Sequence, residues 1–162
     1  MSKGTNFGGW SLDEEVYSWV LENIPKGSTI LELGSGNSTQ EFCKYYKMYS
    51  VEHNEKWLHK SNSTYIHAPI KEYSSYKWYD IEVLKEKLPT EYSLLIVDGP
   101  PGSIGRMGFL HNYNLFRDDV HIVVDDVSRS EEQSISKILQ VQHKKEKIFS
   151  YIKGKKSAHI LK

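Results

Sequence analysis

The sequence Thr29-Ile30-Leu31-Glu32-Leu33-Gly34-Ser35-Gly36 carries the clearest structural signal in the chain. Its first five residues form a short, mostly apolar run, which is typical of a buried β-strand. Gly34 and Gly36 then allow the backbone to turn sharply and to approach a ligand closely. A helical segment is predicted to follow over residues 38–46. This order of strand, glycine-rich turn and helix favours an α/β fold with a parallel sheet.

The same alternation of strands and helices continues along the rest of the chain. Further strands are predicted over residues 48–52, 64–67, 92–97, 121–124, 147–152 and 157–161. Helices are predicted over residues 12–24, 54–58, 80–88, 107–116 and from 128 onward. Ser11 and Ser128 each open a Ser-x-x-Glu pattern, the spacing of a capping box at a helix start. We therefore expect a doubly wound parallel sheet with an antiparallel hairpin strand at one edge.

The composition is that of a globular protein with a single domain over residues 1–162, since 38% of the residues are hydrophobic and 26% are charged. The 21 basic residues balance 21 acidic ones, which gives no support to nucleic acid as a partner. Residues 143–162 are an exception, with seven lysines against one glutamate. This basic segment indicates either an anionic partner or an edge hairpin that lysines protect from aggregation.

Three features of the sequence bear on the location of the protein. No apolar run approaches the ~18 residues that a membrane span needs. Residues 1–10 contain one lysine and no apolar core, so a secretory signal is not expected. Cys43 is the single cysteine, which excludes an intrachain disulfide and a cysteine-based zinc site. We therefore expect a cytoplasmic protein with no membrane partner.

Ligands of parallel α/β sheets bind beyond the carboxyl ends of the strands, so the residues at those ends are candidates for a site. Glu52 ends the second predicted strand, and its carboxylate can accept both hydroxyls of a ribose. The other acidic residues at predicted strand ends are Glu32, Asp98, Asp125 and Asp126. This acidic rim disfavours a pyrophosphate cofactor and favours one with a sulfonium and an ammonium group, such as S-adenosylmethionine. Thr39 replaces the third glycine of the dinucleotide fingerprint, which also argues against a nicotinamide cofactor.

Several motifs together resemble the class I S-adenosylmethionine-dependent methyltransferases. They are Ile30-Leu31-Glu32-Leu33-Gly34-Ser35-Gly36, Val51-Glu52-His53-Asn54 and Leu94-Leu95-Ile96-Val97-Asp98-Gly99-Pro100-Pro101-Gly102. The segments His67-Ala68-Pro69-Ile70 and Trp78-Tyr79-Asp80 also look like those of small members of this family. The resemblance covers nearly the whole chain. It implies a single methyltransferase domain with a Rossmann-like, seven-stranded, mostly parallel sheet whose last strand is antiparallel.

The resemblance also implies which residues hold the cofactor. Gly34 and Gly36, with Ser35 between them, would approach its methionine part. Glu32 would stand near the ammonium group, and Glu52, with His53 beside it, would hold the ribose. Ala68 and Pro69 would flank the adenine, where many relatives have an acidic residue instead. Trp10 is expected either to cover the cofactor or to pack on the first helix.

Methyl transfer often requires a base that removes a proton from the nucleophile. Asp98, at the end of a predicted strand, is the best-placed candidate, and it also lies beside the expected cofactor site. His111, on the predicted helix 107–116, is a second candidate. Arg106, in the loop after Asp98, is predicted to bind an anionic substrate group or to form a surface ion pair.

A divalent cation such as Mg²⁺ is a further expectation from the resemblance. Asp98, Asp125 and Asp126 resemble the magnesium ligands of catechol-type O-methyltransferases, and three carboxylates suit a hard cation. The alternative is that Asp125 and Asp126 cap the following helix or hold Arg129.

The resulting prediction is an S-adenosylmethionine-dependent methyltransferase that acts on an oxygen nucleophile, such as a saccharide or another hydroxyl acceptor. A site without a lid favours a large acceptor or completion of the site in a homo-oligomer. Two alternatives remain: a non-catalytic partner subunit that binds S-adenosylmethionine, and a nicotinamide-dependent oxidoreductase.

Overall fold

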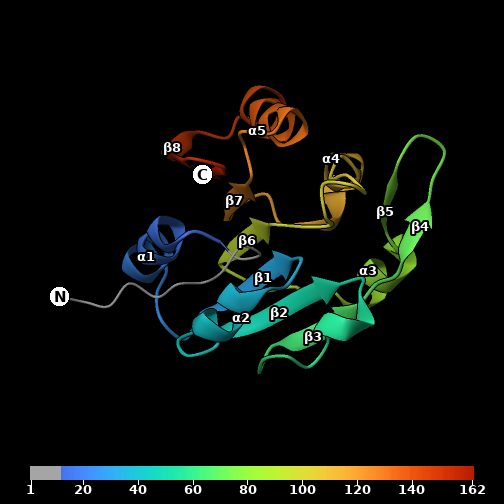
Figure 1. Ribbon diagram of the computed structural model, residues 1–162, viewed down its shortest axis with the longest axis horizontal. Coiled ribbons are helices and arrows are strands. Elements are labelled where there is room, and N and C mark those ends of the chain that lie inside the picture. The colour runs from blue at the N-terminus through green and yellow to red at the C-terminus, as the bar shows by residue number, and fades with distance from the viewer. Residues whose placement is uncertain (1–11) are drawn as a thin grey trace.

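The computed structural model describes residues 12–162, so the capping box predicted at Ser11 and the role predicted for Trp10 lie outside the described residues. The main sheet contains β1 (Thr29–Leu33), β2 (Lys47–Glu52), β3 (Thr64–His67), β6 (Leu94–Val97), β7 (His121–Asp125), β8 (Lys147–Lys153) and β9 (Lys156–Leu161). These seven strands lie in the order β3-β2-β1-β6-β7-β9-β8 (Figure 1). The first five are parallel, and β9 is antiparallel to both β7 and β8. The predicted mostly parallel, seven-stranded sheet is therefore confirmed.

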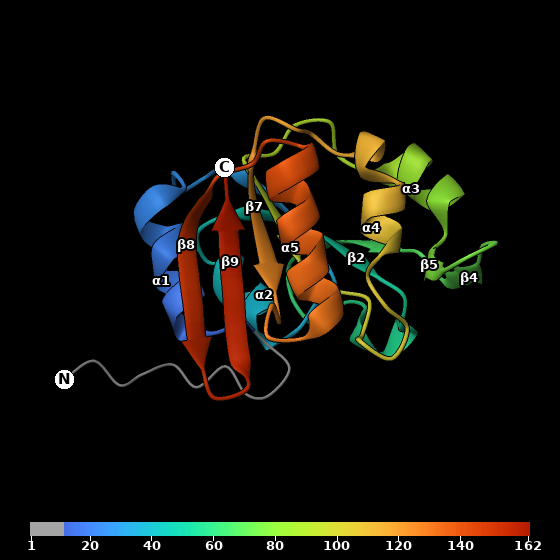
Figure 2. The same ribbon diagram turned by 90° about the horizontal axis from the view of Figure 1, so that it is seen from above.

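Helices cover both faces of the sheet, as the doubly wound prediction requires. They are α1 (Glu14–Asn23), α2 (Asn37–Phe42), α3 (Ile81–Lys87), α4 (Gly108–His111) and α5 (Ser130–Gln142), with short 3₁₀ turns at Glu55–Trp57 and Tyr113–Leu115. Alternate side chains of β1 point to opposite faces of the sheet. Ile30 packs with residues of α1 and α2, whereas Leu31 and Leu33 pack with residues of α3, α4 and α5 (Figure 2). No helix among residues 12–162 has the length and apolar character needed to cross a bilayer.

A hairpin of β4 (Ile70–Glu72) and β5 (Lys77–Tyr79) is the one element of the described chain that the sequence did not predict. Each strand has three residues, too few for a clear period-two pattern. The hairpin nevertheless contributes to the core, because Trp78 and Tyr79 are fully buried. Gly108 lets α4 approach the Trp78 ring: a Cβ there would lie 2.2 Å from Trp78 Cγ.

Two predicted helix starts are displaced. Asp13 caps α1, and its carboxylate accepts a hydrogen bond from Glu15 N. At α5 the N-cap is Arg129, one residue later than the pattern at Ser128 predicts. Glu131 explains this shift, because its carboxylate accepts the backbone N–H groups of Arg106 and Met107 instead of closing a capping box.

The strand order creates a switch point between β1 and β6. From β1 the sheet extends through β2 to β3 on one side, and the chain then returns to place β6 and β7 on the other side. The loops that follow β1 and β6 therefore leave the sheet in opposite directions and open a crevice at its carboxyl edge, where ligands of this architecture bind.

Candidate functional site

A cavity of about 650 Å³ occupies the crevice at the carboxyl ends of β1, β2, β6 and β7. This volume is in the range of small-molecule sites. Eight residues predicted from the sequence line it: Gly34, Ser35, Glu52, His53, Asp98, Arg106, Asp125 and Asp126. The structure thus brings together residues that are up to 92 positions apart in the chain.

Gly34 allows the two loops at the switch point to touch. Its φ is +88°, a conformation that side chains other than glycine rarely adopt. A Cβ atom on Gly34 would lie 2.7 Å from the Asp98 carbonyl oxygen and 2.9 Å from Gly99 Cα. The glycine-rich turn after β1 is therefore packed directly on the loop after β6.

Glu52 is held rigidly at one end of the cavity. The residue is 4% exposed, and Oε2 accepts hydrogen bonds from Ser35 N at 3.1 Å and Ser35 Oγ at 2.7 Å. Oε1 accepts from the backbone N–H groups of His53 and Asn54, both at 3.0 Å. His53 Nδ1 lies 3.2 Å from the same oxygen. The carboxylate thus faces the cavity with a fixed orientation and already accepts one hydroxyl group.

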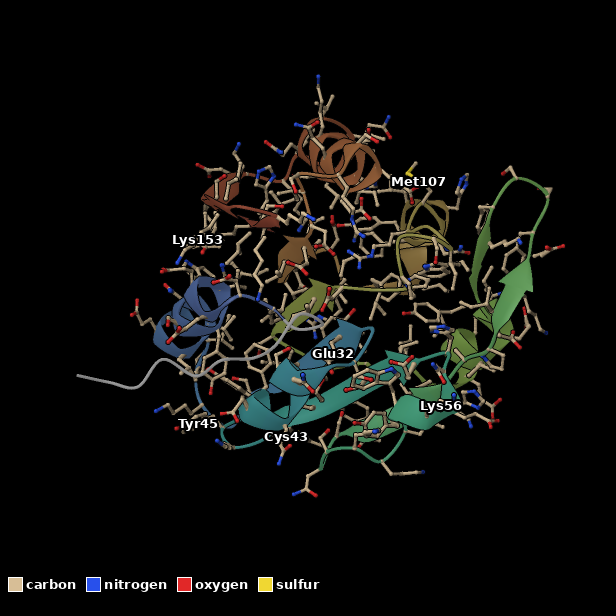
Figure 3. The ribbon with its side chains drawn as sticks, in the orientation of Figure 1. Glu32, Cys43, Tyr45, Lys56, Met107 and Lys153 are labelled. Carbon is tan, nitrogen blue, oxygen red and sulfur yellow. The ribbon has the colours of Figure 1, made fainter. Side chains whose placement is uncertain are left out.

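Glu32, which was expected near the ammonium group of the cofactor, is not among the residues that line the cavity. Its side chain lies on the α2 side of β1 and is 2% exposed (Figure 3). Oε1 accepts hydrogen bonds from Thr39 Oγ1 at 2.5 Å and Ser50 Oγ at 2.7 Å. Thr39 Oγ1 in turn accepts the Gly36 N–H at 3.0 Å. Glu32 therefore stabilises the glycine-rich turn through Thr39, on the face of the sheet that α2 covers. Gly36, which belongs to this network, is not part of the cavity lining.

Burial raises the pKa of Glu32 from 4.5 to about 7, against the opposing effect of its two hydroxyl donors. A raised carboxyl pKa contributes stability below the unfolded-state pKa, and this stability is lost as the pH rises through the folded-state pKa. We expect the wild type to lose roughly 2–3 kcal/mol relative to Glu32→Gln between about pH 5 and about pH 8. Urea unfolding of both proteins across this range measures the difference. A constant difference in the free energy of unfolding would contradict the assignment.

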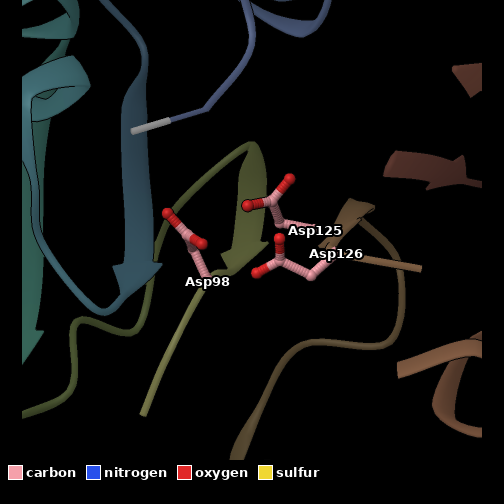
Figure 4. Close-up of side chains that lie close together, drawn as sticks. All are labelled: Asp98, Asp125 and Asp126. Carbon is pink, nitrogen blue, oxygen red and sulfur yellow. The ribbon is translucent and has the colours of Figure 1, made fainter. Parts of the chain in front are cut away.

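Three carboxylates gather at the other end of the cavity. Oxygen atoms of Asp98, Asp125 and Asp126 lie within 4.8 Å of one another (Figure 4). Burial raises the pKa of Asp98 to about 6, while its hydrogen bond with Asp125 and the charge of Arg106 act in the opposite direction. Burial and the neighbouring Asp98 charge hold the pKa of Asp125 well above its ordinary range. Asp126 has a φ of +60°, which aspartate tolerates better than most residues.

Arg106 is buried beneath this cluster, which corrects the surface ion pair predicted for it. Its side chain is 4% exposed, so it forms no surface ion pair. Its Nε donates to the Pro100 carbonyl at 2.9 Å, and its terminal nitrogens donate to the Asp98 carbonyl at 3.0 Å and to Asp126 Oδ2 at 3.1 Å. The N–H groups of Arg106 thus donate to acceptors inside the protein, and its positive charge balances the carboxylates of Asp98 and Asp126.

The charges around the cluster fit a divalent cation. Four carboxylates, those of Asp98, Asp125, Asp126 and Glu132, surround the guanidinium groups of Arg106 and Arg129. Two positive charges thus face four acidic groups, and neighbouring acids add to the effect of burial in raising the pKa values of Asp98 and Asp125. Carboxylate oxygens are ligands that Mg²⁺ prefers, so the donor set is chemically suited to it.

The structure does not bring three other predicted residues to the cavity. Ala68 is fully buried, and its backbone N–H donates to the Glu52 carbonyl at 3.0 Å. Pro69 is exposed and is not part of the cavity lining. His111 is exposed and stacks on Tyr76, with the ring centroids 4.3 Å apart. This placement gives no support to Ala68 and Pro69 as adenine contacts or to His111 as a base.

The cavity lining also contains residues that were not predicted as site residues, among them Trp57, Tyr79, Lys155 and Lys156. Tyr79 reaches the cavity from the unpredicted β4–β5 hairpin. Lys155 lies in the turn between β8 and β9, and Lys156 is the first residue of β9, so the basic C-terminal segment contributes to the site. The seven lysines of residues 143–162 are visible in the sequence, but their place at the site is not. It depends on the position of β9 beside β7, which brings the β8–β9 hairpin to the cavity.

Comparison with protein-family models and with curated proteins found no match. Among solved structures, the chain is similar to the ribosomal protein L11 methylase from Lactobacillus delbrueckii subsp. bulgaricus, with 10% identity, a TM-score of 0.65, and coverage of 99% of this chain and 82% of that one. A putative methyltransferase from Escherichia coli has 15% identity and a TM-score of 0.57, over 91% of this chain and 81% of that one. The B. subtilis tRNA methyltransferase TrmK has 13% identity and a TM-score of 0.52, over 94% of this chain and 66% of that one. The chain therefore has the fold of the class I S-adenosylmethionine-dependent methyltransferases.

Proposed function

We propose that this protein transfers the methyl group of S-adenosylmethionine to a hydroxyl group of its acceptor. The observation that carries the proposal is the single cavity that has the fixed Glu52 carboxylate at one end and the Asp98 cluster at the other. This arrangement lies at the switch point of a methyltransferase fold. A cofactor-binding end and a proton-accepting end are the two parts that methyl transfer requires.

Glu52 supports the cofactor assignment. A carboxylate that accepts the Ser35 hydroxyl at 2.7 Å has the chemistry to accept ribose hydroxyls in the same way. Gly34 and Ser35 complete the lining at this end of the cavity.

Asp98 supports an oxygen nucleophile. In the proposed step the acceptor oxygen forms a bond with the methyl carbon as the carbon–sulfur bond breaks, and the sulfonium becomes a neutral thioether. The hydroxyl proton passes to the Asp98 carboxylate. A pKa of about 6, raised by burial, suits a base that must be ionised near neutral pH and still accept a proton.

Asp98, Asp125 and Asp126 would also hold a divalent cation, as their donor set and the excess of carboxylates indicate. Such an ion, when bound, lowers the pKa of a hydroxyl group that it contacts. The contribution of this chain is to hold the three carboxylates together, with Arg106 as their counterion.

The acceptor is proposed to be large or attached to a polymer, such as a saccharide. Among residues 12–162 no inserted domain covers the cavity, so a large acceptor has access to it. A second subunit is an alternative means of closing the site. The substrates named for the solved neighbours, a ribosomal protein and a tRNA, belong to those proteins and favour no one acceptor here.

A thermal-shift comparison tests the cofactor assignment. We expect S-adenosylhomocysteine and S-adenosylmethionine at about 100 times their dissociation constants to stabilise the protein by ~2.7 kcal/mol, or roughly 5–10 °C. NAD and NADP should give no shift, and each ligand is measured with Mg²⁺ and with EDTA. A shift with the nicotinamide cofactors alone would identify an oxidoreductase and overturn the proposal. Cofactor binding without methylation of any hydroxyl acceptor would favour the non-catalytic subunit.

A further inference from the structure

Tyr79 presents a buried hydroxyl group that the fold itself does not use. Its side chain is fully buried, and its OH has no hydrogen-bond partner within residues 12–162. Among the described residues, Trp78 Nε1 is the other buried polar side-chain atom without a hydrogen-bond partner. Trp78 is not part of the cavity lining, whereas Tyr79 is. An unpaired buried hydroxyl destabilises a protein unless a ligand or solvent satisfies it.

The hydroxyl of Tyr79 lies at the centre of the switch point. A Cβ on Gly99 would be 2.5 Å from Tyr79 OH and 2.8 Å from Gly34 Cα, so the hydroxyl reaches the place where the two glycine loops meet. A side chain at Gly99 would fill this space. Glu52 at one end of the cavity and Asp98 at the other both act electrostatically on the phenol.

The phenol is fixed as a neutral hydrogen-bond donor. Burial, together with the nearby negative charge of Glu52, holds its pKa well above the ordinary value for tyrosine. The aromatic ring is anchored by Trp78, whose ring centroid is 5.5 Å away. Little conformational freedom is therefore lost when the hydroxyl donates to a ligand, which favours binding.

We propose that Tyr79 OH donates a hydrogen bond to an oxygen or nitrogen acceptor of the adenosyl cofactor bound between Glu52 and Asp98. This inference rests on the proposed function, since it concerns the same cavity. The methyl acceptor is the other conceivable source of an accepting atom. Binding of S-adenosylhomocysteine in the absence of any acceptor separates the two sources.

Tyr79→Phe removes the hydroxyl alone and is tested by calorimetric titration with S-adenosylhomocysteine. We expect the dissociation constant to rise about 5- to 10-fold relative to the wild type. The unliganded variant should melt at the same temperature as the wild type or higher, because it no longer buries an unpaired hydroxyl. A purely structural role would lower the melting temperature instead.

Tyr46→Phe is the matched control. Tyr46 is 5% exposed, and its hydroxyl donates to the carbonyls of Val20 at 3.1 Å and Ile24 at 2.8 Å, away from the cavity. This variant should melt at a lower temperature and bind S-adenosylhomocysteine as the wild type does. Equal affinity of the wild type and Tyr79→Phe would overturn the inference and leave the proposed function intact. No binding by the wild type would overturn both.

Discussion

Arg106→Met is expected to destabilise the protein by roughly 3–5 kcal/mol, a large part of the stability of an ordinary domain. The guanidinium is nearly inaccessible to water, and it satisfies the carbonyls of Pro100 and Asp98 as well as the Asp126 carboxylate. Methionine fills similar space but leaves these acceptors unpaired. Removing this buried counterion also leaves the half-exposed Arg129 as the remaining cation beside four acids, and losing one partner is the costly way to break a buried ion pair.

Urea unfolding followed by circular dichroism measures this loss. Arg117→Met is the matched control, because Arg117 pairs with Glu91 and Asp119 in an exposed setting. Exposed ion pairs contribute roughly 0–1 kcal/mol, so this variant should unfold close to the wild type. An Arg106→Met variant as stable as Arg117→Met would show that the acids need no internal cation, and the description of the cluster would then be wrong.

The sheet could be predicted from the sequence because its strands are buried on both faces. Segments such as Leu94–Val97 are short continuous apolar runs, which are typical of the central strands of a parallel sheet. The hairpin from Ile70 to Tyr79 could not be predicted in this way. Its strands are short, and one of them faces solvent through Lys71 and Glu72. The burial of its last two residues depends on α4 and the sheet, which lie elsewhere in the sequence.

The position of the site could also be predicted, because parallel strands end at one edge. The partners of individual side chains could not. Glu32 stands at a strand position that suggests a ligand contact, yet its carboxylate is satisfied by Thr39 and Ser50 on the opposite face. Arg106 was expected to bind an anionic substrate group or to form a surface ion pair. Its buried ion pairs include Asp126, which follows β7, and Glu132 on α5, which are at least 20 residues away in the chain.

Glu52→Gln should weaken the binding of S-adenosylhomocysteine by about 10- to 100-fold, because a hydrogen bond to a charged group contributes roughly 1.5–3 kcal/mol. The glutamine amide has nearly the same shape as the carboxylate. It would, however, present an N–H group where Glu52 Oε2 now accepts from Ser35 N and Oγ. The ribose hydroxyls would lose a charged acceptor, and the turn after β1 would lose its anchor. The effect should therefore appear in the affinity and the binding enthalpy.

Glu41→Gln provides the control for this substitution. Glu41 lies on α2, pairs with Lys44 at 2.7 Å and is not part of the cavity lining. Its replacement makes the same change of charge on the whole protein without touching the site. Any difference between the two variants can therefore be assigned to the position of Glu52 and not to the net charge.

Isothermal titration of the wild type, Glu52→Gln and Glu41→Gln with S-adenosylhomocysteine tests the central claim most directly. The account predicts saturable binding at one site per chain for the wild type and Glu41→Gln, and a dissociation constant at least about tenfold higher for Glu52→Gln. No binding by the folded wild type, or equal affinity in Glu52→Gln, would contradict the assignment of this cavity to the cofactor.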